Sequence, residues 1–219
     1  MSTTTQFFNS NNKLITEQQA NQLNSFSKNI YIDGFLKKEE DYRENILKGG
    51  VYYLSPSENV TAVLNDIGIG LNWAIKSNKQ IINGYTIWEI RWYDNNLQTK
   101  SEYAKEVRDS SENPIATVTF DTITNQTKGA YKVFYYGNQQ LPDGDPGDLF
   151  PDDSWIGFSF SDDGTIQNIT MMYNMFNNEG YWTKLSRFLE DTGDFLQEIG
   201  MTPEKLNYFT NVNPVVPNF

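Results

Sequence analysis

The chain has 219 residues, a formal net charge of −11 at neutral pH and a sequence pI of about 4.4. It contains neither cysteine nor histidine. This excludes disulfides, thiolate nucleophiles and the Ser-His-Asp and Cys-His mechanisms. A chain this acidic repels phosphate backbones and anionic lipid and attracts basic surfaces, so we expect neither nucleic acid nor a membrane among its partners.

The first residues are polar and rich in asparagine. We expect residues 1–15 to be a flexible N-terminus and residues 16–219 to form a single domain. The N-terminal stretch lacks the basic and apolar regions of a signal peptide. Together with the absence of cysteine, this predicts a cytoplasmic location.

Two local patterns predict the regular elements of the chain. Helical spacing and capping residues such as Thr16 with Gln19 predict helices, namely over residues 17–26, 55–67 and 182–199 and again from Thr202 onward. Apolar alternation bounded by turn residues such as Asp33-Gly34 predicts strands, namely over residues 29–32, 35–42, 51–54, 85–93, 97–107, 115–120, 131–136, 155–160 and 165–173.

The strand over residues 85–93 has the clearest alternation. Aromatic and β-branched side chains fill it, and Trp88 and Trp92 share one of its faces. With its return strand it forms a ribbon over residues 85–103, which we expect at the centre of a sheet. The fold class predicted is α+β, with a mainly antiparallel, hairpin-built sheet and helices near the N-terminus and at the C-terminus. The C-terminal helices should pack against aromatic side chains on one side of this sheet.

Two hairpins share a sequence pattern. Asp33-Gly34-Phe35-Leu36 leads to Asp41-Tyr42, and Asp94-Asn95-Asn96-Leu97 leads to Glu102-Tyr103, with the Asp, Leu, acidic and Tyr positions aligned. Convergence on the same turn chemistry explains the match equally well. The pattern also resembles the β-hairpin repeats of MORN-variant proteins, which are common among bacterial immunity proteins of interbacterial toxin systems. The resemblance implies an immunity function and assigns no functional residue.

The densest acidic stretch lies in a segment rich in proline and glycine, which predicts a surface loop. Clustered carboxylates in a loop suit Ca²⁺ or a basic partner, although the EF-hand pattern fails here because Ser154 stands where its bidentate Glu belongs. A solvated loop that only aids solubility is the plain alternative. The candidate partner-binding residues are Asp143, Asp145, Asp148, Phe150, Asp152, Asp153 and Trp155.

Two further groups of residues suit binding or catalysis. Glu89 beside Trp88 and Trp92 suits a sugar-binding or glycosidase site, although a strand glutamate paired with Arg91 explains the same residues. Tyrosines favour binding surfaces as well as cores, and those considered for exposure are Tyr52, Tyr53, Tyr93, Tyr135 and Tyr136. No nucleotide-binding signature is present. We expect no catalytic residue, metal or cofactor.

The sequence therefore predicts a non-catalytic, protein-binding immunity protein. It would neutralise a cognate toxin that has a basic surface by direct complex formation and occlusion of the toxin's active site. A carbohydrate-binding or carbohydrate-active domain that uses exposed tryptophans and a carboxylate is the alternative. A scaffold module with an unknown partner is a third possibility.

Overall fold

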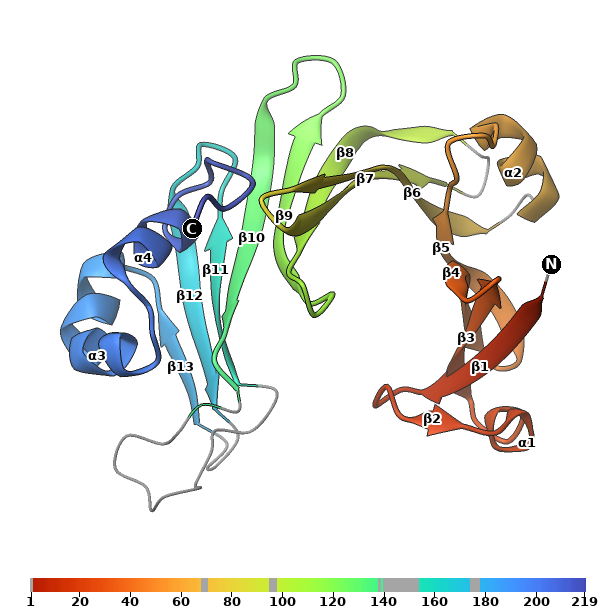
Figure 1. Cartoon of the computed structure of the whole chain (residues 1–219), viewed down its shortest axis with the longest axis horizontal. Coiled ribbons are helices and arrows are strands. Elements are labelled where there is room, and N and C mark those ends of the chain that lie inside the picture. Colours follow the sequence, from red (N-terminus) through yellow and green to blue (C-terminus); the bar gives the residue numbers. More distant parts are fainter. Residues whose placement is uncertain (1, 68–70, 95–97, 138, 140–153, 174–177) are drawn as a thin grey trace. The chain divides into compact units, whose positions relative to one another are not determined.

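The computed structural model describes residues 2–67, 71–94, 98–137, 139, 154–173 and 178–219. Its strands form a 13-stranded sheet in the order β13-β12-β11-β10-β9-β8-β7-β6-β5-β4-β3-β1-β2 (Figure 1). Helices account for only 17% of these residues. The predicted α+β class is therefore wrong, and the protein is mainly β. Each segment predicted to be helical does contain a helix, but the helices are shorter than predicted and strands hold most of the described residues.

Four helices and thirteen strands make up this part of the chain. The helices are α1 (Glu17–Ala20), α2 (Val60–Ile67), α3 (Leu185–Glu198) and α4 (Pro203–Phe209). The strands are β1 (Thr3–Asn9), β2 (Leu14–Ile15), β3 (Ser25–Ile32), β4 (Phe35–Arg43), β5 (Ile46–Tyr53), β6 (Asn72–Ile82), β7 (Tyr85–Tyr93), β8 (Thr99–Arg108), β9 (Pro114–Asp121), β10 (Thr127–Tyr135), β11 (Trp155–Phe160), β12 (Ile166–Tyr173) and β13 (Asn178–Trp182).

The ribbon that the sequence placed at the centre occupies that place. β7 has the predicted bounds and is the seventh of the thirteen strands in the sheet order. The turn at Asp33-Gly34 is also confirmed, because both residues have positive φ, 50° and 83°. It joins β3 to β4 in antiparallel register.

β5 and β6 pair in parallel, and α2 lies between them in the chain. Two glycines that we expected to precede a strand, Gly49 and Gly50, lie inside β5 instead. A Cβ at Gly49 would stand 1.8 Å from the carbonyl oxygen of Asn72, and a Cβ at Gly50 would stand 1.9 Å from that of Glu39. Only residues without a side chain fit between these neighbouring strands.

The chain divides into two compact units. Unit 1 comprises Met1–Lys79 and Trp88–Tyr103, and unit 2 comprises Gln80–Ile87 and Ala104–Phe219. In unit 1, the residues expected to be loose at the N-terminus instead form β1, which pairs with β3 from Thr3 to Asn9. The main core of unit 1 lies where α2 packs on the sheet, as the helical spacing indicated, and its buried members are Leu64, Trp73, Ile75 and Tyr93.

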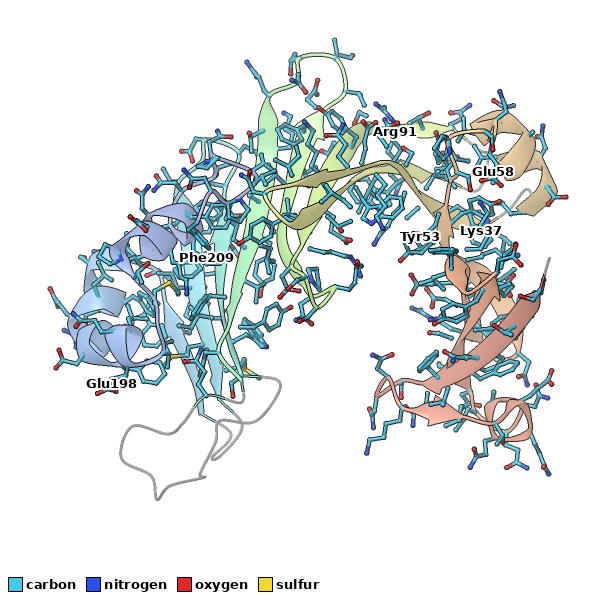
Figure 2. All side chains as sticks on the ribbon, viewed as in Figure 1. Lys37, Tyr53, Glu58, Arg91, Glu198 and Phe209 are labelled. Atoms are coloured by element: carbon cyan, nitrogen blue, oxygen red, sulfur yellow. The ribbon has the colours of Figure 1, made fainter. Side chains whose placement is uncertain are left out.

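Unit 2 has the larger core. α3 and α4 cover one face of its strands, and the aromatic residues expected under the C-terminal helices are found there. Phe209 of α4 (Figure 2) illustrates this contact. Its ring centroid lies 5.5 Å from that of Phe134 on β10. The core residues with the least exposure are Val118, Tyr136, Ile156, Phe158, Ile169 and Phe188.

A polar cluster fixes the connection from β5 to α2. Lys37 forms a short ion pair with Glu58 and also donates to the Ser55 hydroxyl at 3.0 Å (Figure 2). The Tyr52 hydroxyl and the Ser55 amide donate to the same carboxylate at 2.7 and 2.6 Å. Burial acts to raise the pKa of Glu58, but these donors outweigh it and lower the pKa to about 2.

Because of this cluster, part of the free energy of unfolding should vary with pH in the acidic range. Because the Glu58 pKa is depressed from 4.5 to about 2, its contribution is present above about pH 4.5 and is lost as the pH falls toward 2. We expect Glu58→Gln to lower the urea midpoint at neutral pH, and the difference from wild type to shrink in acid.

The matched control is Glu190→Gln, because Glu190 forms an exposed i,i+3 ion pair with Arg187. We expect this control to change stability by less than about 0.5 kcal/mol. Equal destabilisation of the Glu58→Gln variant at neutral and acid pH would contradict the assignment.

Candidate functional site

On one face of the unit 2 sheet, two rows of paired residues run across the strands, and neither row contains a charged residue. Paired residues in neighbouring strands point to the same face. The first row runs Thr117, Tyr131, Ser159, Asn168 across β9 to β12. The second runs Val133, Gly157, Thr170, Tyr181 across β10 to β13. We call these eight residues, with Trp155, the aromatic face.

The helices of unit 2 lie on the other side. Lys132, Phe134 and Phe158 alternate with residues of the aromatic face along β10 and β11, and these three point into the region covered by α3 and α4. Tyr131 and Tyr181 remain 39% and 62% exposed. Large aromatic side chains on a face that the helices leave uncovered are candidates for partner contact.

A glycine shapes the centre of this face. A Cβ at Gly157 would stand 2.3 Å from the Tyr131 hydroxyl and 2.7 Å from the Trp155 ring. Both rings therefore rest over the bare α-carbon of Gly157 and meet edge to face, with centroids 6.5 Å apart and planes at 80°. Gly157 thus lets two bulky rings lie low on the sheet while Tyr131 keeps exposed surface.

The composition of the face resembles that of evolved binding surfaces. Tyrosine and tryptophan offer large contact areas at low entropic cost, and serine, threonine and asparagine offer adaptable hydrogen bonds. Tyr131, Gly157 and Tyr181 were not among the candidate binding residues predicted from the sequence. The alternation of tyrosine and valine in β10, and the glycine inside β11, are the signals that point to them.

The predicted acidic site falls almost wholly outside the described residues. Asp143, Asp145, Asp148, Phe150, Asp152 and Asp153 belong to that stretch, so their role in partner binding stays a prediction. Trp155 is described, and it lies on the aromatic face. Of the tyrosines considered for exposure, Tyr93 and Tyr136 are buried.

The alternative site around Glu89 does not come together in unit 1. Trp88 meets Tyr53 edge to face at 5.4 Å, and Lys79 lies 5.4 Å from its ring centroid. Glu89 points to the opposite face of β7, where its carboxylate accepts from Arg91 at 2.8 Å. The carboxylate and the tryptophan therefore do not face a common ligand.

The pair Ser55 and Lys37 has the spacing of a nucleophile and a base, with 3.0 Å between the hydroxyl and the amine. A lysine that serves as a base must be neutral. The Lys37 amine is instead engaged in the ion pair with Glu58, so the cluster joins β5 to α2 and does not activate the serine.

Neither a metal centre nor a spanning helix is found in the described part of the chain. Its carboxylates form no group of three or more that is placed to hold a metal ion. None of its helices has the length and apolar character to cross a membrane. No protein-family model, curated protein or solved structure matches the chain.

Adding one methyl group at Gly157 tests whether the two rings depend on its lack of a side chain. We expect Gly157→Ala to displace the rings of Tyr131 and Trp155 and to destabilise the protein by about 1–3 kcal/mol, as overpacking does. Denaturant unfolding followed by tryptophan fluorescence measures this directly.

Gly193→Ala in α3 is the control, because a Cβ at that position meets nothing within 4 Å. Alanine in place of a mid-helix glycine should stabilise by about 0.5–1 kcal/mol. A neutral or stabilising Gly157→Ala would show that the rings do not depend on the missing side chain.

Proposed function

We propose that this chain is a non-catalytic, cytoplasmic binding protein that acts as an immunity protein, neutralising a cognate bacterial toxin by forming a complex with it. The aromatic face is the observation that carries the proposal. It combines exposed Tyr131 and Tyr181, half-buried Trp155 and hydroxyl or amide neighbours, and α3 and α4 pack on the opposite face. Occlusion of the toxin's active site follows if this face covers it.

In this proposal, the net charge affects association and the aromatic face affects dissociation. The net charge of −11 attracts a basic toxin from a distance and raises the encounter rate. The aromatic face is uncharged in its two rows, so it holds the partner through buried area and neutral hydrogen bonds. Salt should therefore slow association, whereas changes to the aromatic face should speed dissociation.

The sequence pattern shared by the two hairpins resembles MORN-variant repeats. This resemblance is the reason to propose an immunity protein rather than another kind of binding protein. The absence of histidine and cysteine agrees with a protein that blocks a reaction without performing one.

A neutral carbohydrate is the second candidate ligand. The uncharged rows of the aromatic face and the exposed surface of Tyr131 favour it. The perpendicular arrangement of Tyr131 and Trp155 offers a sugar no continuous flat surface, so the protein partner is preferred. Binding to a glycan array that is lost in Tyr131→Ala would reverse this preference.

The test is co-expression with the product of the adjacent upstream gene, followed by binding measurements on the purified pair. We expect the wild-type chain to protect cells. In the double variant Tyr131→Ser, Tyr181→Ser we expect at least about a tenfold faster dissociation, since buried aromatic residues dominate interface energies.

Ile123→Ser serves as the matched control, because Ile123 is 91% exposed at the β9–β10 turn, away from the aromatic face. This control should bind like wild type. If the neighbour is harmless, or kills equally with and without the chain, the immunity proposal fails. If the folded double variant dissociates as slowly as wild type, the aromatic face is not the interface.

A further inference from the structure

The last residues of the chain lie across unit 2 and are held by side-chain hydrogen bonds and apolar contacts. We call residues 211–219, which follow α4, the C-terminal strap. Its backbone carbonyls accept hydrogen bonds from four side chains of unit 2, at distances of 2.8, 2.9, 3.1 and 3.4 Å. The donors are Lys132, Tyr208, Asn83 and Tyr85.

Lys132 is the unusual member of this set. It is fully buried, and its amine donates to the carbonyl oxygens of Tyr208 at 2.9 Å and Pro214 at 2.8 Å. The amine also lies 3.6 Å from the centroid of the Tyr208 ring. It therefore joins three elements, namely β10, the last turn of α4 and the strap.

Among the described residues, no carboxylate pairs with this amine. The titratable group that faces it from α4 is the Tyr208 phenol, and the strap presents backbone carbonyls. Nearby, Lys205 of α4 donates to the carbonyl oxygen of Gly200, and Tyr85 donates to the strap at Phe219. Burial raises the pKa of both Tyr208 and Tyr85, so these phenols stay neutral near pH 7.

We propose that the C-terminal strap detaches from the sheet as a unit while the rest of unit 2 stays folded, and that the protonation of Lys132 sets how tightly the strap is held. The contacts are compatible with separate release. The four hydrogen bonds to its carbonyls come from side chains. Its buried apolar members are Val212 and Pro217, and the part-buried Val215 and Val216 pack against buried residues of unit 2. Phe219 is 40% exposed and contacts the rings of Tyr208 and Phe209.

The direction of the effect follows from burial. Burial lowers the pKa of Lys132 from 10.5 to about 7 when the strap is closed. Opening the strap exposes the amine to water and returns its pKa toward the ordinary value. Between about pH 7 and 10 the open form therefore binds one more proton than the closed form, and closure strengthens as pH rises. Below about pH 7 both forms are protonated, and closure is weakest and constant.

The chain's lack of cysteine allows a specific reporter. Val212→Cys places one thiol on the buried side of the strap. Its labelling rate, divided by that of an unfolded peptide at the same pH, gives the opening constant. We expect this constant to fall by about tenfold per pH unit from pH 7 to 9 and to be flat from pH 6 to 7.

Two further variants complete the test. Ile169→Cys, fully buried on β12, reports opening of the whole unit, and it should label far more slowly than Val212→Cys. In the Lys132→Met background, the opening constant at Val212→Cys should lose its dependence on pH.

Each result bears on the proposal. Equal opening constants at Val212→Cys and Ile169→Cys would overturn the separate release of the strap. An opening constant at Val212→Cys that does not change from pH 6 to 9 would overturn the role of Lys132. Should Lys132→Met fail to fold, the pH dependence and the comparison of the two cysteines still decide.

Discussion

The close approach of β5 to its two neighbours is the constraint on which the sheet depends. Gly49 and Gly50 carry positive φ values of 144° and 158°, and any side chain there would collide with the backbone of Asn72 or Glu39. The parallel pairing of β5 with β6 requires this approach. A parallel pair needs a crossover connection, and α2 supplies it. The core around Trp73 forms where that helix packs.

Charged groups serve the architecture in two different ways. The ion pair between Lys37 and Glu58 sits among donors that all favour the carboxylate, so charge is stabilised where the chain leaves β5. Lys132 is the opposite case, because it is buried against neutral groups and its charged form is disfavoured. The first arrangement fixes a connection. The second makes the closure of the strap sensitive to protons.

The two faces of the unit 2 sheet carry different kinds of side chains. One face is filled by the aromatic core under α3 and α4, and the other presents Tyr131, Trp155 and Tyr181 over small and hydroxyl-bearing residues. Strand alternation makes this division possible, since neighbouring residues in β10 serve opposite faces. Two uncharged rows on a chain of net charge −11 separate long-range attraction from short-range fit.

The sequence by itself determined the features that depend on neighbours in the chain. The alternation of β7, the turn at Asp33-Gly34, the capping box of Thr16 and the start of α4 at Thr202-Pro203 were all predictable, because each rests on contacts a few residues apart. The α+β class was wrong because the helices that form at such signals hold few residues, whereas thirteen strands make up most of the described chain.

Tertiary structure alone decided which residues meet across strands. β6 was missed because its polar second half carries no clear alternation, and its place is set by pairing with β5. Tyr131 reaches Gly157 only through the register of β10 with β11, and Lys132 becomes buried only when α4 and the strap close over it. Such contacts join residues that are distant in sequence, so composition and local pattern do not specify them.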